Sequence, residues 1–326
     1  MLLKELFEFM PKSSHPASYG QKQGAFPFFT SSNTIDKYCY EADYNGEYLI
    51  VGDGGTGNCK YYNGKFSVSD HNYVLKPIEG TNCKLLQYFL MKDNYKILNE
   101  GFKGIGIKNV SKTYIQNIDF KKNNSYSDEY IVNSLIMIEK IIKKEQLQLD
   151  KLNELIKSRF NEMFSAFPKV ELSQISQIIM GQSPESTAYN DDGIGLPFFQ
   201  GKADYGEKYT VVKHYTKKWN KEAKRGYVLM SVRAPVGPVN IASTDCAIGR
   251  GLCAMNAKPN KANNEFLYNA LNSMQQEIVL SGKDGSTFAA INKDQVYKLL
   301  LPQAPIELQN DFSEFVHHFD KLKFSL

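Results

Sequence analysis

The chain has 326 residues, of which 42% are hydrophobic and 23% are charged, and its formal net charge is +4. This composition is typical of a folded, water-soluble protein, and the length is sufficient for two domains, each with its own core. No apolar run approaches the ~18–20 residues that a membrane-spanning helix requires, and the first five residues lack the basic-then-apolar order of a signal peptide. We therefore expect a cytoplasmic protein with no membrane association.

The first half of the chain recurs in the second half. Pro27-Phe28-Phe29 returns as Pro197-Phe198-Phe199, 170 positions later, and Ile115 matches Val296 at an offset of 181. A drifting offset is what loop insertions leave in a duplicated module, and the unit is too long for a solenoid repeat. The sequence therefore predicts two similar globular domains, each followed by its own helix.

Each copy has the pattern of a mixed α and β domain. Strand-like segments lie between Gly, Pro and Asn turns, at residues 48–51, 73–76, 227–232 and 251–255. Helical periodicity fits residues 85–91 and 265–278. The expected class is therefore α+β.

The strongest single element is a long helix between the two copies. Apolar residues recur in steps of four and three, at Ile131, Leu135, Ile138, Ile142, Glu145, Leu149, Leu152, Ile156, Arg159 and Met163, of which only two are polar. This heptad pattern favours a coiled coil over a long core helix, because the other faces carry Lys, Glu, Asn and Gln throughout. Ser127 can cap the start and Pro168 stops the helix, so a rod of roughly 60 Å is expected.

A shorter helix follows the second copy after Pro305. By the constant offset Leu326 corresponds to Glu145, so the second helix is truncated relative to the first. Folded back antiparallel, it would cover only the region from Leu149 to Met163, and the stripe before it would face water unless a partner binds. The predicted subunit interface comprises Ile131, Leu135, Ile138, Ile142, Leu149, Leu152, Ile156, Phe312, Val316 and Phe319.

Signals for catalysis or a cofactor are weak. Residues 52–57 match Gly-x-Gly-x-x-Gly, but a dinucleotide site needs a helix next, and residues 59–66 have the pattern of a strand and a turn. No Gly-x-x-x-x-Gly-Lys-[Ser/Thr] phosphate loop is present. The five cysteines contain no Cys-x-x-Cys pair, so free thiols are expected rather than disulfides or a zinc site.

Several motifs make the chain resemble a known family. They are residues 152–164 at the end of the predicted central helix, Pro-Phe-Phe near the start of each copy, Leu301-Pro302-Gln303-Ala304-Pro305, and the ending Phe319-Asp320-Lys321-x-Lys323-Phe324. Together with the order domain, long helix, domain, helix, they resemble the specificity subunit of type I restriction–modification enzymes. The resemblance covers nearly the whole chain. It implies target-recognition domains at 1–126 and 168–301, a central spacer helix at 127–167 and a truncated second spacer helix at 302–326.

Membership of this family would imply a non-catalytic subunit that binds double-stranded DNA, with each domain reading one half of a split site. The helices would space the domains and dock two methyltransferase subunits, and restriction/translocase subunits would join through them. S-adenosylmethionine, ATP and Mg²⁺ would then act on those partners, with no cofactor on this chain. Two alternatives remain: a truncated subunit active only as a homodimer through the exposed seam, and the recognition part of a fused modification enzyme.

The candidate DNA contacts are polar, aromatic and basic residues of expected loops and strand ends. In the first domain they are Ser31, Ser32, Asn33, Lys37, Asn58, Lys60, Tyr61 and Tyr62. A hairpin packed on the core is the alternative for the tyrosine-rich run. In the second domain they are Gln200, Lys202, Lys213, His214, Lys217, Lys218, Arg233, Arg250, Lys283, Ser286 and Thr287.

Arginine is unevenly distributed. The chain contains only Arg159, Arg225, Arg233 and Arg250, and three of these lie in the second domain while the first domain has none. Because arginine is the commonest bidentate reader of guanine, we predict that guanine readout by arginine is confined to the second half-site. A surface ion pair is the alternative for each arginine.

Overall fold

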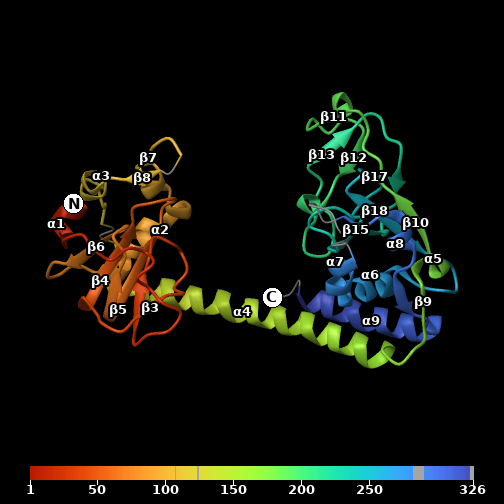
Figure 1. Ribbon diagram of the computed structural model, residues 1–326, viewed down its shortest axis with the longest axis horizontal. Helices are drawn as coiled ribbons and strands as arrows, with labels where there is room; N and C mark the ends of the chain where they lie inside the picture. The colour runs from red at the N-terminus through yellow and green to blue at the C-terminus, as the bar shows by residue number, and fades with distance from the viewer. Residues whose placement is uncertain (107, 123–124, 282–289, 324–326) are drawn as a thin grey trace. The chain divides into compact units, whose positions relative to one another are not determined.

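A single helix, α4 (Asp128–Phe164), separates two mixed α/β domains in the computed structural model, which describes residues 1–106, 108–122, 125–281 and 290–323 (Figure 1). Ser127 caps this helix by accepting a hydrogen bond from the Tyr130 amide at 3.2 Å. The chain divides into two compact units, Met1–Ile142 and Lys143–Leu326, and the second contains helix α9 (Ile306–Lys323). The predicted α+β class, with two similar domains, a long central helix and a second helix, is confirmed. The finer domain boundaries stay predictions.

The first unit is built on one six-stranded sheet with strand order β1-β6-β4-β5-β2-β3. The strands are β1 (Phe7–Phe9), β2 (Phe26–Phe29), β3 (Tyr38–Cys39), β4 (Tyr44–Gly52), β5 (Cys59–Val68) and β6 (Asn72–Pro77). The other elements are α1 (Leu3–Leu6), α2 (Cys83–Asn99), α3 (Lys112–Gln116) and the pair β7 (Phe102–Lys103) and β8 (Asn109–Val110).

Alternation along β4 places side chains on both faces of this sheet. Leu49 and Val51 join the cluster that includes Leu86 and Leu90 of α2, whereas Ile50 joins Phe29 and Phe66 on the opposite face. All of these side chains are essentially inaccessible to solvent. The period of two expected for a strand therefore gives the first unit a core on each side of its sheet.

The second unit contains two sheets, ordered β10-β18-β15-β16 and β11-β13-β12-β17-β14. Their strands are β10 (Ser176–Met180), β11 (Tyr189–Asn190), β12 (Leu196–Phe199), β13 (His214–Thr216), β14 (Glu222–Ala223), β15 (Val228–Ser231), β16 (Val239–Ile241), β17 (Cys246–Ile248) and β18 (Leu252–Ala257). The pair β9 (Lys169–Glu171) and β19 (Leu300–Pro302) and the short helices α5 (Leu172–Ile175), η1 (Ser186–Ala188), η2 (Lys202–Asp204) and α8 (Lys293–Tyr297) accompany them. Helices α6 (Asn264–Ser273) and α7 (Gln275–Ser281) cover one face.

The two units share a pairing pattern. β2 pairs in parallel with β5 at Phe28 and Ser67, and β12 pairs in parallel with β17 at Phe198 and Ala247. The long strand β5 corresponds to two strands of the second unit, β16 and β17, which an interruption separates. One continuous sheet in the first unit therefore becomes two sheets in the second.

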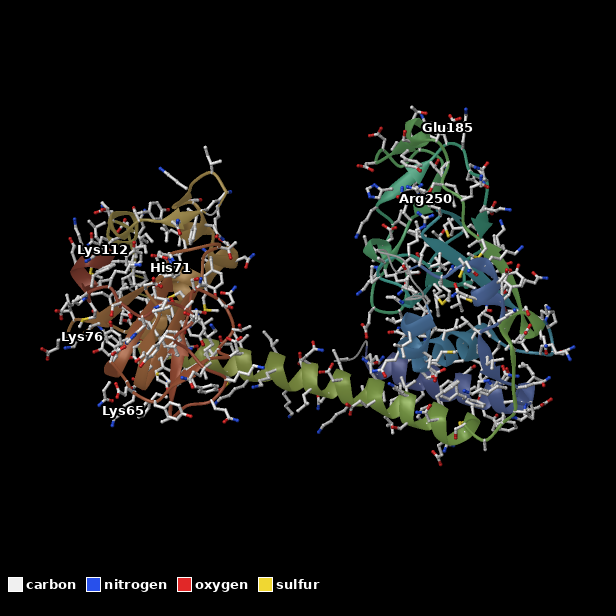
Figure 2. All side chains as sticks on the ribbon, viewed as in Figure 1. Lys65, His71, Lys76, Lys112, Glu185 and Arg250 are labelled. Carbon is white, nitrogen blue, oxygen red and sulfur yellow. The ribbon has the colours of Figure 1, made fainter. Side chains whose placement is uncertain are left out.

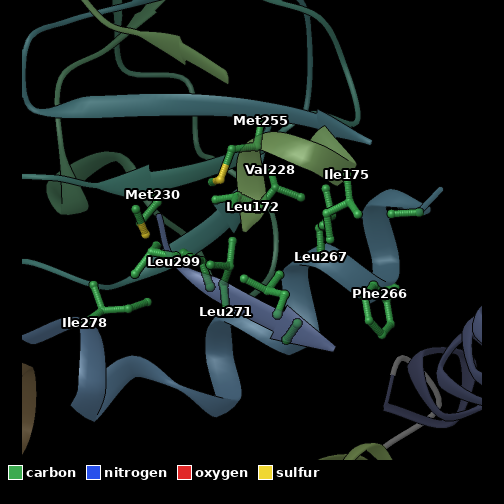
Figure 3. Close-up of a cluster of buried hydrophobic side chains, with 14 of the residues drawn as sticks. Leu172, Ile175, Val228, Met230, Met255, Phe266, Leu267, Leu271, Ile278 and Leu299 are labelled. Atoms are coloured by element: carbon green, nitrogen blue, oxygen red, sulfur yellow. The ribbon is translucent and has the colours of Figure 1, made fainter. Parts of the chain in front are cut away.

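The main core of the second unit lies between the β10-β18-β15-β16 sheet and the helices. Val228, Met230 and Met255 project from the sheet toward Leu267 and Leu271 of α6 (Figure 3). These side chains are completely buried. This packing fixes α6 on the sheet and provides the surface on which α9 and the end of α4 rest.

Four phenylalanines join α4, α6 and α9 within the second unit. The ring of Phe312 on α9 lies 5.4 Å from that of Phe160 and 5.5 Å from that of Phe164 on α4, and Phe266 of α6 lies 5.0 Å from Phe164. Further along, Lys323 donates to the side-chain oxygen of Asn153 at 2.6 Å. The predicted antiparallel packing of the second helix on the far part of the first is therefore confirmed.

The register of this packing differs from the heptad prediction. The buried positions are Ile156, Phe160 and Phe164, in steps of four, whereas Arg159 is exposed and pairs with Glu162. Steps of four are the rows that interlock when helices pack in a globular core. Within the described ranges, no helix has the length and apolarity needed to cross a membrane.

Candidate nucleic-acid interface

The first-domain candidates divide into surface residues and interior residues. Ser32 and Asn33 are exposed in the segment between β2 and β3, and Ser31 and Lys37 are half-buried there. Lys37 donates to the Ala17 carbonyl at 2.6 Å, so part of its hydrogen-bonding capacity is already used.

Asn58 and Lys60 lie in the interior, with 2% and 8% of their surfaces exposed. Asn58 Nδ2 donates to the Ser31 carbonyl at 2.7 Å, and Lys60 Nζ donates to the Thr30 carbonyl at 3.2 Å and to Asn58 Oδ1 at 2.9 Å. In this conformation both side chains hold the segment that follows β2. Both side chains therefore support that segment, and their role as DNA contacts stays a prediction.

Burial changes the protonation behaviour of Lys60. Removal from water disfavours the ammonium form and lowers its pKa to about 8, while the nearby Cys59 opposes this shift. Because no carboxylate pairs with Lys60 in the described part of the chain, carbonyl and amide oxygens provide its compensation.

The tyrosine-rich run lies in strand β5 and packs partly on the core, as the hairpin alternative describes, while its role as a DNA contact stays a prediction. Tyr62 packs edge-on against Phe29, with ring centroids 5.2 Å apart, and against Phe66 at 5.6 Å. Lys84 lies over the ring of Tyr61 at 5.3 Å. Both tyrosines are half-buried, so core packing occupies much of their ring surface.

The glycine-rich stretch at 52–57 lies at the turn of the antiparallel β4–β5 hairpin and is followed by a strand, not by the helix that a dinucleotide site needs. Within it, Asp53 pairs with Lys12, and its Oδ1 lies 3.1 Å from His71 Nδ1, with only 13% of the aspartate side chain exposed. The exposed lysines labelled in Figure 2 for this unit, Lys65, Lys76 and Lys112, lie at separate places on its surface.

The second-domain candidates that the structure describes are all exposed. They are Gln200, Lys202, Lys213, His214, Lys217, Lys218, Arg233 and Arg250. His214 Nδ1 lies 2.6 Å from Asp191, and Lys213 donates to the Ala203 carbonyl. Lys283, Ser286 and Thr287 lie outside the described residues.

Arg233 and Arg250 are brought together at one pocket of the second unit (Arg250 is labelled in Figure 2). Its other walls are Met180, Val232, Ala290, Ile291, Asn292 and Gln295. No carboxylate belongs to this described lining, and both arginines are exposed. Gln200 lies close to this pocket, because its carbonyl oxygen approaches Gly251, the residue after Arg250. A Cβ placed on Gly251 would lie only 2.2 Å from that oxygen.

Hydrogen bonding identifies the first-domain position that corresponds to Arg233. Arg233 forms an isolated antiparallel bridge with Ala290, and Gly54 forms the matching bridge with Asn109. The arginine of the second domain therefore replaces a residue without a side chain.

Arg250 can be matched in the same way. In the second domain the amide of Val232, which precedes Arg233, donates to the Gly251 carbonyl at 2.9 Å. In the first domain the amide of Asp53, which precedes Gly54, donates to the His71 carbonyl at 3.1 Å. Gly251 and His71 therefore occupy equivalent positions, and so do the residues before them, Arg250 and Asp70. At this edge, the second domain carries two arginines where the first carries a glycine and an aspartate.

A basic turn between β13 and β14 was predicted only in part. Lys217, Lys218, Trp219 and Lys221 are all exposed, and only the first two were among the candidates. The available signal was the chain's single tryptophan within a lysine-rich run.

The predicted subunit-interface residues fall into three groups: exposed, buried and half-buried. On α4, Ile138 and Ile142 are 51% and 60% exposed, accompanied by Ile141 at 50%. The core instead takes up Ile156, Phe312 and Val316, which are at most 7% exposed. The remaining members are half-buried: Ile131, Leu135, Leu149, Leu152 and Phe319.

Comparison with known proteins agrees with this architecture. The chain is 29% identical over 259 residues to a protein named as the type I restriction enzyme MjaX specificity subunit of Methanocaldococcus jannaschii. The aligned region covers 73% of this chain and 60% of that relative.

Two solved structures share the fold. A type I restriction–modification S subunit from M. genitalium superposes with a TM-score of 0.66 at 15% identity, covering 100% of this chain and 90% of the other. A structure concerned with complex assembly and conformational transition of the type I restriction–modification system has a TM-score of 0.55 at 21% identity, covering 100% and 91%.

A family model described as the type I restriction modification DNA specificity domain matches residues 1–156 and matches again at 165–326. The first match covers one sheet-containing domain and most of α4, and the second covers the other domain and α9. The chain therefore belongs to the type I restriction–modification DNA specificity family.

Proposed function

We propose that this chain is the sequence-specific DNA-binding subunit of a type I restriction–modification system and carries no catalysis itself. Each domain reads one half of a bipartite duplex site, and the helices space the two readers. The observation that carries this proposal is the double family match, one per half of the chain. Two similar readers joined through a helix suit two separated half-sites, as half-site spacing follows protein geometry in dimeric DNA-binding proteins.

The two half-sites differ in sequence. The edge that carries Arg233 and Arg250 in the second domain carries Gly54 and Asp70 in the first. Arginine reads guanine through two hydrogen bonds in the major groove, and each such pair contributes about 1–3 kcal/mol of discrimination. Guanine readout by arginine therefore belongs to the second half-site.

Methyltransferase subunits dock on the helices, and restriction/translocase subunits join through them. S-adenosylmethionine, ATP and Mg²⁺ act on those partners. The exposed stripe of Ile138, Ile141 and Ile142 supports this proposal, because contiguous apolar surface on a helix marks an interaction site.

Methylome sequencing of the source cell, with and without the gene, tests the function. Loss of methylation at one bipartite motif is the expected result. Complementation with Arg233→Ala or Arg250→Ala should relax the second half-site while leaving the first unchanged. Methyl transfer by the purified chain alone would refute the non-catalytic role, and unchanged selectivity in both variants would end the arginine assignment.

A homodimer is the second candidate, supported by the same stripe on α4. Sedimentation of the purified chain at micromolar concentration distinguishes the two arrangements. A dimer dissociated by Ile138→Gln/Ile142→Gln would favour self-association, whereas a monomer that binds the methyltransferase subunit would favour docking of that partner.

A further inference from the structure

The turn between β13 and β14 differs in charge from its counterpart in the first domain. Resting on the proposed function, we infer that residues 217–221 form a contact with the DNA phosphate backbone that the second domain makes and the first does not. The contact is independent of sequence, so it adds affinity and salt dependence to one half-site only.

Hydrogen bonds hold this turn at both ends. The Thr216 hydroxyl donates to the Lys218 carbonyl at 2.6 Å, and the Lys217 amide donates to the Ala188 carbonyl at 3.1 Å. At the far end the Ile248 amide donates to the Lys221 carbonyl at 3.1 Å. The turn is therefore an ordered platform that presents its side chains to solvent.

The neighbouring acids already have partners. Glu222 accepts from the Trp219 indole at 3.3 Å and pairs with Lys224. Asp245 pairs with Lys224 at 3.1 Å and accepts from the Arg225 amide at 2.8 Å. One lysine, Lys224, therefore serves both acids, and neutral N–H donors take up part of their remaining acceptor capacity.

Three lysines of the turn are left for a ligand: Lys217, Lys218 and Lys221. All are exposed, and no carboxylate within the described part of the chain forms an ion pair with them. Exposed lysines of this kind make the contacts to phosphate that position a protein on duplex DNA.

Trp219 adds apolar surface to the cationic turn. Its side chain is 43% exposed, although its indole N–H is directed to Glu222. A ring anchored at its polar end and open along its apolar edge suits a wet interface. We assign it to contact with the sugar face of the backbone beside the lysines.

The first domain has the same turn with the opposite charge. Cys39 occupies the place of Thr216, since Phe26 pairs with Cys39 as Leu196 pairs with Thr216. Its Sγ lies 3.1 Å from the Glu41 carbonyl, matching the Thr216 contact.

The exposed residues that follow Cys39 are Tyr40, Glu41 and Asp43, and Asp43 forms an ion pair with His15 at 3.3 Å. This turn contains two acids and no lysine, so it repels phosphate where the second domain attracts it.

The basic turn also leads into the proposed guanine-reading edge. Lys221 is hydrogen-bonded to Ile248, the last residue of β17, and the next exposed residue along the chain is Arg250. The proposed contact with the DNA backbone at residues 217–221 is therefore joined directly to the strand that leads to Arg250, the proposed base reader.

The test is the salt dependence of binding to a bipartite duplex, measured with the full chain and its methyltransferase partner. Each phosphate contact contributes about −0.9 to the slope of log K against log[salt], so the triple variant Lys217→Gln/Lys218→Gln/Lys221→Gln should make that slope less negative by about 2.7. The matched control removes three exposed lysines of the same unit, as Lys169→Gln/Lys261→Gln/Lys298→Gln. An equal change in the control would show a net-charge effect and overturn the assignment.

A second readout uses the single tryptophan. Incorporation of 5-fluorotryptophan into this chain, with unlabelled partner, gives one ¹⁹F resonance at position 219, which should shift when duplex is added. Specific DNA binding with an unmoved resonance and an unchanged slope in the triple variant would overturn the turn contact while leaving the proposed function intact. A wild-type complex that binds no duplex would overturn both.

Discussion

Lys208 shows how a single residue connects the second recognition domain to its helices. Its Nζ lies 3.0 Å from Glu265 of α6 and also pairs with Asp320 of α9. Burial acts to lower its pKa, but the two carboxylates outweigh burial and the pKa is raised. The side chains of Lys208 and Asp320 are each only 15% exposed, so removal of the lysine would leave two poorly solvated acids.

We expect Lys208→Met to lower the free energy of unfolding by about 3 kcal/mol, as loss of one partner from a buried ion pair does. Since the pKa of Lys208 is raised on folding, its stabilisation is complete below the pKa of an unfolded lysine, about 10.4, and is lost as pH rises through the folded value. Urea unfolding at neutral and strongly alkaline pH measures both effects. Lys224→Met is the control: Lys224 also pairs with two acids but is 57% exposed, and its loss should matter much less.

Lys60 should show the opposite pH dependence. Its pKa falls to about 8 on folding, so the unfolded chain binds more protons between pH 8 and the pKa of a free lysine near 10.4. The contribution of Lys60 to the free energy of unfolding should therefore rise with pH through this window, so the stability of the wild type relative to Lys60→Met should increase with pH. Urea unfolding of both proteins at several pH values isolates the difference, and parallel pH profiles would contradict it.

At the scale of elements, α4 has two different surfaces. Its end joins the phenylalanine cluster around Phe312, whereas Ile138 and Ile142 face solvent. Phe312→Ala should lower the free energy of unfolding by about 3–5 kcal/mol, because it empties a fully buried ring site. Thermal or urea unfolding of the full chain provides the measurement.

Substitutions in the exposed stripe of Ile138 and Ile142 should affect partner binding and leave stability almost unchanged. Ile138→Gln/Ile142→Gln should change stability by no more than about 0.5 kcal/mol per site, as surface substitutions usually do. It should nevertheless weaken binding of the methyltransferase subunit at least tenfold in titration calorimetry. Unchanged affinity would remove the stripe from the proposed interface.

Sequence periodicity predicted the elements better than their register. The apolar run at residues 48–51 was sufficient to predict a strand within β4, and Leu49, Ile50 and Val51 contribute in turn to a core on one face or the other. Along α4, a heptad step selected Arg159, whereas packing against α6 and α9 buries Phe160. Which of two adjacent positions is buried depends on neighbours that are remote in sequence, so a local pattern does not decide it.

At the scale of the whole molecule, the same limit applies to the candidate site. Exposure of the charged second-domain candidates followed from their polar character and loop positions. Burial of Lys60 did not, because it depends on contact with Thr30, 30 positions away in the chain. The charge difference between the two edges was also hidden, since Asp70 and Arg250 become equivalent only once strand pairing aligns them.

Each recognition module begins and ends at adjacent points. The Leu3 amide donates to the Ile118 carbonyl at 3.0 Å, and the Leu172 amide donates to the Leu299 carbonyl at 2.7 Å. A domain whose first and last residues lie close together can be exchanged for a related domain without changing the path of the rest of the chain. Under the proposed function, exchange of one such module would replace the half-site that it reads and leave the helices unchanged, so a single recombination event would create a new target specificity.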